Sequence, residues 1–153
     1  MKLLDWFLLK AALLAFVLLL LQVVFAPKVN LLLTCVLVFA SMLSIYETLA
    51  LAVLASTLTA ALLYHGAYPW YYLVLGLIAS LINPKQIPDK FIVTILYAIL
   101  FTAAVELFNP NSTAYFDRLV ESLPVTAFAA IPLYFLVLLL FKDYIPKRSY
   151  GKS

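Results

Sequence analysis

Long apolar stretches, separated by narrow clusters of polar and charged residues, are the main pattern along this chain. Five stretches contain no Asp, Glu, Lys or Arg, namely residues 11–27, 29–46, 48–84, 91–105 and 122–141. A helix needs about 20 apolar residues to cross a hydrocarbon core about 30 Å thick. The pattern therefore predicts an integral membrane protein built from spanning helices.

The longer stretches must reverse direction within the membrane protein. Residues 29–65 would form one helix about 55 Å long, so we expect a tight hairpin near Ser44–Glu47. A second reversal is expected at His65–Pro69, because Gly66 permits a left-handed helix cap and Pro69 suits a first helical turn. Polar loops follow at residues 83–90 and from Asn109, and residues 115–123 could form a short interfacial helix.

These boundaries predict an all-α membrane protein, a compact bundle of six transmembrane helices in one domain that covers residues 1–153. The expected spans are roughly 4–25, 29–45, 48–64, 70–82, 91–108 and 124–141.

Composition supports the same class. Hydrophobic residues make up 67% of the chain and charged residues 11%, whereas soluble chains average about 25% charged residues. A soluble domain with this composition could not cover its surface with polar side chains. The net charge of +3 comes from Lys and Arg near the ends of the apolar stretches, which is typical of membrane topology and lipid contact rather than of nucleic-acid binding.

The positions of Lys and Arg predict the orientation. With six spans and the amino terminus inside, eight basic residues lie on the inner side: Lys2, Lys10, Lys85, Lys90, Lys142, Lys147, Arg148 and Lys152. Only Lys28 and Arg118 lie on the outer side. Because cytoplasmic loops carry the excess of Lys and Arg, both termini are predicted to be cytoplasmic. Lys85, Lys90, Lys142, Lys147 and Arg148 are the expected cytoplasmic contacts.

The sequence offers little for catalysis, and we expect a protein that is not an enzyme and needs no cofactor or metal. It has one His, one Cys and three Gly, so a zinc-type ligand pair and a phosphate-binding glycine loop are both missing. Glu47 and Glu106 are the only acidic residues at the edges of apolar stretches, and we interpret both as hydrated helix ends. Cys35 is expected to be a small buried apolar residue.

Small residues at helical spacing are the stronger pattern. They allow close helix packing, either within the bundle or against the membrane helix of a partner. The candidates for partner-helix packing are Ala11, Ala15, Ala52, Ser56, Ala60, Gly76 and Ser80. The surfaces of the first two spans, rich in Leu, Val and Phe, suit lipid or another protein, and we expect the partner on spans 1 to 3.

Aromatic residues gather around the second reversal. Either they form an interfacial aromatic belt, or they form a rim that binds a ligand or a partner. The candidates for an outer rim are His65, Tyr68, Trp70, Tyr71, Tyr72 and Glu106.

Three features together resemble the MreD family of rod shape-determining proteins. They are a proline-led entry to the second span (APKVNLLL, residues 26–33), the six-span plan, and a last span that begins RLVESLPVT (residues 118–126), continues through IPLY (residues 131–134) and leads to a basic tail. Residues 60–66 differ, because MreD-like chains often have an acidic residue after this stretch. The resemblance implies a non-catalytic scaffold of the bacterial cell-elongation and peptidoglycan-synthesis machinery in the inner membrane. It also implies binding to MreC and a link to MreB filaments and wall-synthesis enzymes.

The MreD family is similar in fold to the substrate-binding subunits of energy-coupling-factor vitamin transporters, which gives the alternative function. In such a subunit Ala11 and Ala15 would form a docking surface on the first span. A vitamin pocket would need several converging polar groups, for which the outer-rim residues and Asn109 are the candidates.

Overall fold

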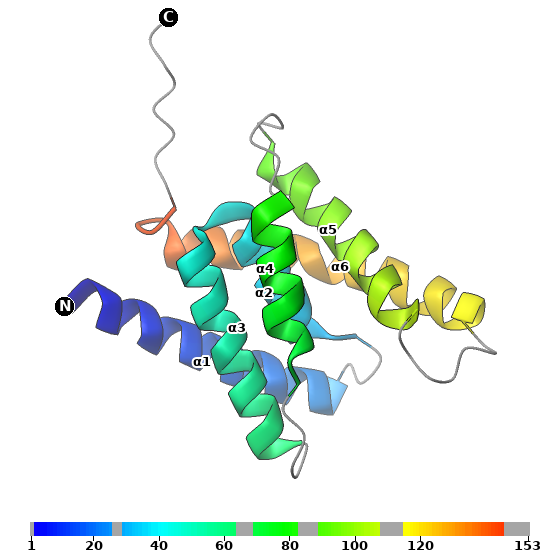
Figure 1. The fold of residues 1–153 in the computed structure, drawn as a ribbon, viewed down its shortest axis with the longest axis horizontal. Helices are drawn as coiled ribbons and strands as arrows, with labels where there is room; N and C mark the ends of the chain where they lie inside the picture. The colour runs from blue at the N-terminus through cyan, green and yellow to red at the C-terminus, as the bar shows by residue number, and fades with distance from the viewer. Residues whose placement is uncertain (1, 26–28, 64–68, 83–88, 108–114, 146–153) are drawn as a thin grey trace, which may run out of the picture.

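The computed structural model of the chain describes residues 2–25, 29–63, 69–82, 89–107 and 115–145. Within these residues it contains six α-helices and no strands: α1 (Lys2–Phe25), α2 (Leu31–Met42), α3 (Ile45–Leu62), α4 (Tyr71–Ile82), α5 (Lys90–Leu107) and α6 (Tyr115–Phe141) (Figure 1). The predicted all-α class is confirmed. Four of the helices, α1, α3, α5 and α6, are long and apolar enough to cross a membrane, which is compatible with a multi-pass membrane protein.

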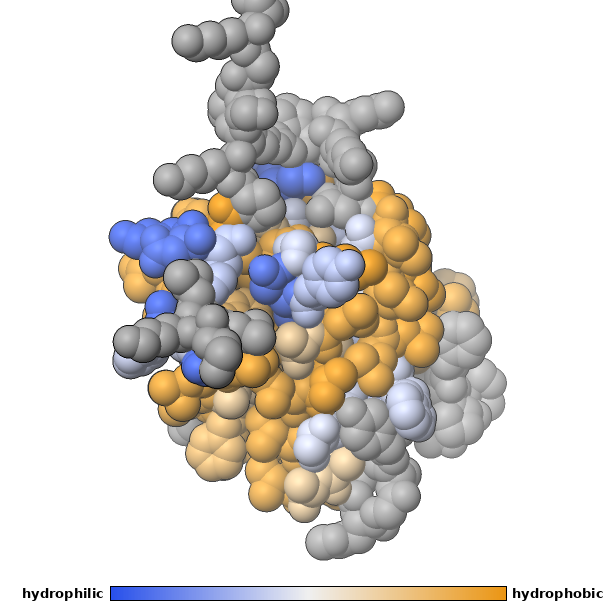
Figure 2. All heavy atoms as spheres, turned by 60° about the vertical axis from the view of Figure 1, so that its left-hand side comes forward, coloured by the Kyte–Doolittle hydropathy of each residue, from blue (hydrophilic) through white to orange (hydrophobic). Residues whose placement is uncertain are grey.

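The distribution of side chains is compatible with a protein surrounded by lipid. Leu, Val, Ile and Phe side chains are exposed along the outer helices, whereas eight Ser and Thr residues are buried in the interior. Figure 2 shows a face that is largely apolar, with hydrophilic residues gathered towards its upper left. Without a hydrophobic driving force between helices in lipid, packing and interhelical hydrogen bonds must hold such a bundle together.

Helix α2 is the centre of the bundle. It contacts all five other helices, and every residue from Leu32 to Met42 is buried. A helix that is apolar on all sides is stable only when it is enclosed. The expectation that the second span presents a surface to lipid or a partner is therefore wrong, because its whole circumference is covered by the protein itself.

Both α2 and α4 have only 12 residues, so each is about 18 Å long. The chain reverses between α2 and α3 at Leu43 and Ser44, close to the hairpin expected near Ser44–Glu47. Leu43 and Ser44 are extended, and the backbone N–H of Leu43 donates to the carbonyl of Phe39 at 2.7 Å.

The helix ends collect at two ends of the bundle. In Figure 1 the starts of α1, α3 and α5 and the ends of α2, α4 and α6 lie towards the upper left and top, and the opposite helix ends lie towards the lower right and bottom. The end of the bundle where α2, α4 and α6 begin is called the Asn30 end, after the residue that caps α2. The end where α1, α3 and α5 begin is called the Phe7 end.

Helix α6 differs from the expected arrangement. Instead of a short helix at residues 115–123 and a new span from Pro124, one helix of 27 residues continues through Pro124 and Pro132. Each proline removes one backbone hydrogen bond. Both rings lie on the exposed side of α6, next to Val120 and Phe128, which are 71% and 77% exposed. They therefore do not interrupt the face that packs against the bundle.

Candidate polar site at the Asn30 end

Asn30 organises the first turn of α2. Its Oδ1 accepts a hydrogen bond from the backbone N–H of Leu33 at 2.9 Å, as expected for a helix N-cap. Gln22 of α1 reaches across, and its Oε1 accepts from the N–H of Leu32 at 3.3 Å. The N–H groups of Leu31 and Thr34 donate to the carbonyls of Val29 and Asn30. The N–H groups of Leu31, Leu32 and Leu33, which a helix leaves without internal partners, are thereby satisfied.

Two tyrosines of α4 complete the environment of Asn30. The Tyr72 hydroxyl donates to Asn30 Oδ1 at 3.1 Å, and Asn30 Nδ2 donates to the Tyr71 hydroxyl at 3.1 Å. The two rings lie against each other with centroids 4.3 Å apart. Tyr72 is fully buried. It faces the interior rather than an outer rim, because Asn30 offers its hydroxyl a partner there.

The other predicted rim residues lie in different surroundings. Trp70 is 65% exposed, as an interfacial aromatic residue would be. His65 and Tyr68, like Asn109, lie outside the described residues. The described members of the predicted rim therefore do not form one site. Tyr71 and Tyr72 bond to Asn30, whereas Glu106 belongs to a separate ion pair.

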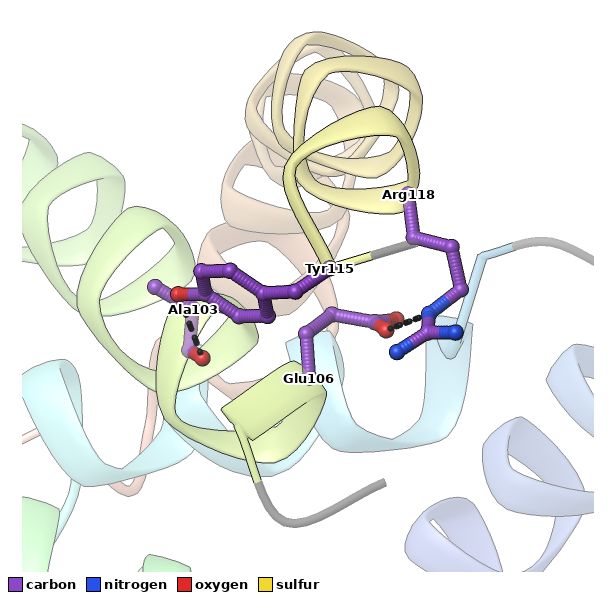
Figure 3. A network of polar contacts seen from close by, with 4 residues as sticks. All are labelled: Ala103, Glu106, Tyr115 and Arg118. Carbon is purple, nitrogen blue, oxygen red and sulfur yellow. Dashed lines mark hydrogen bonds and ion pairs between the residues drawn. The ribbon is translucent and has the colours of Figure 1, made fainter. Parts of the chain in front are cut away.

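Glu106, in the last turn of α5, pairs with Arg118 in the first turns of α6. Arg118 Nε donates to Glu106 Oε2 at 3.0 Å, and the two side chains are only 27% and 19% exposed. Figure 3 shows the guanidinium facing the carboxylate. Beside them the Tyr115 hydroxyl donates to the Ala103 carbonyl at 3.5 Å. Glu106 is therefore a paired, mostly buried carboxylate rather than the hydrated helix end expected from the sequence.

A small cavity lies between α2, α5 and α6 at this end. Its volume is about 50 Å³, and it is lined by Asn30, Leu33, Thr102, Val105, Glu106, Ser122 and Thr126. Ser122 is 7% exposed, and its Oγ is buried without a hydrogen-bond partner. Three hydroxyl side chains, one amide and one carboxylate already paired with an arginine make this a hydrogen-bonding cavity. The described residues contain no group of three or more His, Cys, Asp or Glu that could hold a metal ion.

Most of the small residues predicted for helix packing are buried within the bundle. Ala11 and Ala15 of α1 and Ala52 and Ser56 of α3 are fully buried, and α1 packs against α3. Gly76 of α4 is also buried, with Val36 of α2 so close that an added Cβ would lie 2.9 Å from Val36 Cγ1.

Packing within the bundle, the first of the two alternatives, accounts for these five positions. Ala60 and Ser80 are half-buried. A partner helix would have to contact other residues on the outside.

The Phe7 end is held by an aromatic cluster and one half-buried hydrogen bond from a lysine. Phe141 meets Phe7 and Phe39 edge to face, Phe7 and Phe39 are tilted to each other, and the three centroids lie 4.9–6.3 Å apart. Tyr144 packs on Phe7. Lys10 Nζ donates to the carbonyl of Leu140 at 3.2 Å. A lysine at this position stabilises the helix end, because the last carbonyls of α6 carry partial negative charge.

The basic residues predicted as cytoplasmic contacts lie at this end where they are described. Lys142 is exposed just after α6, and Lys90 begins α5. Lys85, Lys147 and Arg148 fall outside the described residues.

No family model matches the chain, and no curated protein or solved structure matches it either.

Proposed function

We propose that this chain is a non-catalytic, multi-pass membrane scaffold that works by binding a partner protein in the membrane. The observation that carries the proposal is the way the interior polar groups are used. Ser41 bonds to Thr94 between α2 and α5 at 2.6 Å, and Tyr97 bonds to the carbonyl of Ala79 between α5 and α4 at 2.8 Å. These groups join helices rather than line a path through the bundle, whereas the outer faces remain apolar.

The outer face of α1 is the surface we propose for the partner. Leu9, Leu13 and Val24 are 60–65% exposed along the length of this helix. Its 20-residue window Asp5–Val24 has the highest mean hydropathy of the four long helices, 2.6. The exposed face of α6 is broken by two prolines, so α1 offers the smoother surface for a second helix.

The finer proposal is a scaffold of the MreD type in the bacterial inner membrane, which binds an MreC-type protein and links MreB filaments to wall-synthesis enzymes. Its support is the resemblance of residues 26–33, 118–126 and 131–134 and the inner-side excess of basic residues. The start of α1 and the end of α6 lie at one end of the bundle (Figure 1), as two cytoplasmic termini require. The vitamin-binding alternative would need a larger pocket than the cavity described above, because about 50 Å³ is small beside the roughly 300–1,000 Å³ of typical ligand pockets.

Site-specific photo-crosslinking in the native membrane tests the proposed surface. A photoreactive phenylalanine derivative at Leu13 or Val24 of α1 should capture a specific membrane protein, identified by mass spectrometry as MreC-like. The matched control is Leu100 of α5, which is 62% exposed but lies on another helix. Equal capture of lipid alone from all three positions would refute the partner surface. Capture of a specific protein that is unlike MreC would support the proposed scaffold function but contradict the MreD assignment.

A reporter fusion tests the orientation. A reporter fused after Gly66 should be active outside the cytoplasm, since the proposed topology places this reversal on the outer side. Fusions at residues 85 and 152 serve as controls and should report from the cytoplasm. A cytoplasmic signal at Gly66 would contradict the six-span arrangement.

A further inference from the structure

The cavity at the Asn30 end contains a buried hydroxyl group that the helix packing does not use. Ser122 Oγ is buried without a hydrogen-bond partner, and Ser122 lines the cavity together with Thr102 and Thr126. A buried polar group without a partner costs about 1–3 kcal/mol relative to one that is bonded. In native proteins a buried polar group that lacks a protein partner usually forms a hydrogen bond to water or to a ligand.

The lining disfavours a charged occupant. A cation would approach the Arg118 guanidinium, which lies 3.0 Å from the only carboxylate of the cavity. An anion would need donors, but the first-turn N–H groups of α2 already donate to Gln22, Asn30 and Val29. An anion would also meet the Glu106 carboxylate. What remains is a neutral group that can both donate and accept, as a hydroxyl does.

The size and the position of the cavity further restrict which ligands it can hold. A water molecule needs about 10–15 Å³ of such space, so a cavity of about 50 Å³ holds roughly three to five groups of that size. The cavity lies near the end of α5, and Leu107, which follows the lining residue Glu106 in the chain, is 63% exposed. An exposed apolar side chain at this position can pack against an acyl chain while a headgroup reaches the hydroxyl-lined cavity.

We propose that this cavity binds a polyol group of three or so carbons, with Ser122, Thr102 and Thr126 forming hydrogen bonds to its hydroxyls. The polyol can be the glycerol headgroup of a phospholipid or a free polyol in solution. The site does not depend on which protein the scaffold binds, and a negative result here would leave the crosslinking test of that proposal untouched.

Lipid binding to the purified full chain tests the site. Native mass spectrometry with defined lipid would give dissociation constants for phosphatidylglycerol and for phosphatidic acid of the same acyl chains, which lacks the glycerol hydroxyls. Phosphatidylglycerol should bind more tightly, and Ser122→Ala should weaken it about three- to tenfold through the loss of one or two neutral hydrogen bonds. Ser80→Ala is the matched control, because Ser80 Oγ is also buried without a partner but does not line the cavity.

The second probe is free glycerol, and it separates the two sources. If a lipid headgroup is the occupant, Ser122→Ala weakens phosphatidylglycerol binding and leaves phosphatidic acid unchanged. If a free polyol is the occupant, glycerol stabilises the wild type and Ser80→Ala against heat more than it stabilises Ser122→Ala, while lipid binding is equal. Thr126→Val provides a second cavity variant should Ser122→Ala fold poorly. Equal responses of both cavity variants and Ser80→Ala to both probes would overturn the site.

Discussion

Helices α2 and α3 both pack against α4 at Gly76, and Gly76→Ala perturbs this contact. The added Cβ would lie 2.9 Å from Val36 Cγ1, 3.6 Å from Thr48 Cγ2 and 3.7 Å from Ala52 Cβ. Carbon atoms pack best at about 3.5–4.0 Å, so only the contact with Val36 is too short, by about 0.6 Å. Val36 is fully buried, and its branched side chain has one strongly preferred rotamer in a helix. Rotating the Val36 side chain away from the new Cβ would therefore cost free energy.

The magnitude follows from two opposing effects. Over-packing a tight core costs about 1–3 kcal/mol, whereas Ala is about 1 kcal/mol better than Gly in a helix interior. We therefore expect Gly76→Ala to lower the free energy of unfolding by about 0–2 kcal/mol. Val36→Ala removes the methyl group that the new Cβ meets. The pair Gly76→Ala/Val36→Ala should be more stable than the sum of the single changes by about 1–2 kcal/mol.

A double-mutant cycle measures this coupling directly. Unfolding of the purified protein in mixed micelles of detergent and SDS, followed by circular dichroism, would give the four free energies. The control cycle replaces Val36→Ala with Val53→Ala, because Val53 lies on α3 and is 45% exposed. Independent sites add within about 0.3–0.5 kcal/mol, so the control should be additive. Additivity in the Gly76–Val36 cycle as well would refute the close approach of α4 to α2.

Three further changes test the charged contacts and the burial of α2. Glu106→Gln should lower the free energy of unfolding by about 1–3 kcal/mol, because the half-buried Arg118 charge loses its carboxylate. Adding Arg118→Gln should recover part of this loss in the same assay. Zero coupling between the two changes would mean that the ion pair contributes nothing to stability. Lys10→Met keeps the apolar stem of the side chain but removes the donor to the Leu140 carbonyl. Hydrogen exchange of the last turn of α6 should therefore become faster, and the free energy of unfolding should fall by about 1 kcal/mol. Unchanged exchange would contradict a stabilising role of Lys10 at this helix end. Cys35 is fully buried and is the only cysteine, so N-ethylmaleimide should label it only after unfolding in SDS; rapid labelling of the native protein would show that α2 is not enclosed.

The number and rough position of the helices could be predicted because charges and prolines mark where apolar stretches end. The reversal near Ser44–Glu47 was predicted from length and from the side on which Lys85 and Lys90 must lie, since no Gly or Pro lies near it. Which helix lies in the centre could not be predicted in this way. Residues 31–42 and the first span are both rich in Leu and Val, and in a membrane the side facing lipid is as apolar as the side facing protein. Burial of α2 depends on its neighbours, not on its own composition.

The candidate site was predicted only in fragments. Glu106 and Arg118 were placed on the same side of the membrane, but their pairing depends on how α5 and α6 align. Proline at position 124 favours a helix start, and the chain nevertheless continues as a helix from Tyr115. The contacts of Tyr115 with Ala103 and of Arg118 with Glu106 hold these first turns against α5. Tertiary contacts of this kind override local preferences and leave no mark in the sequence pattern.

The short central helix explains why polar groups gather where they do. With 12 residues, α2 is shorter than the roughly 30 Å core of a membrane, so in a membrane its end groups would need partners within the protein. Gln22, Asn30 and the tyrosines of α4 provide those partners at one end. The polar environment that stabilises this buried helix end also keeps it from being filled by apolar side chains. The cavity beside Asn30 is then a consequence of the architecture, and the hydroxyl of Ser122 makes it a place where a ligand can gain binding energy without disturbing the bundle.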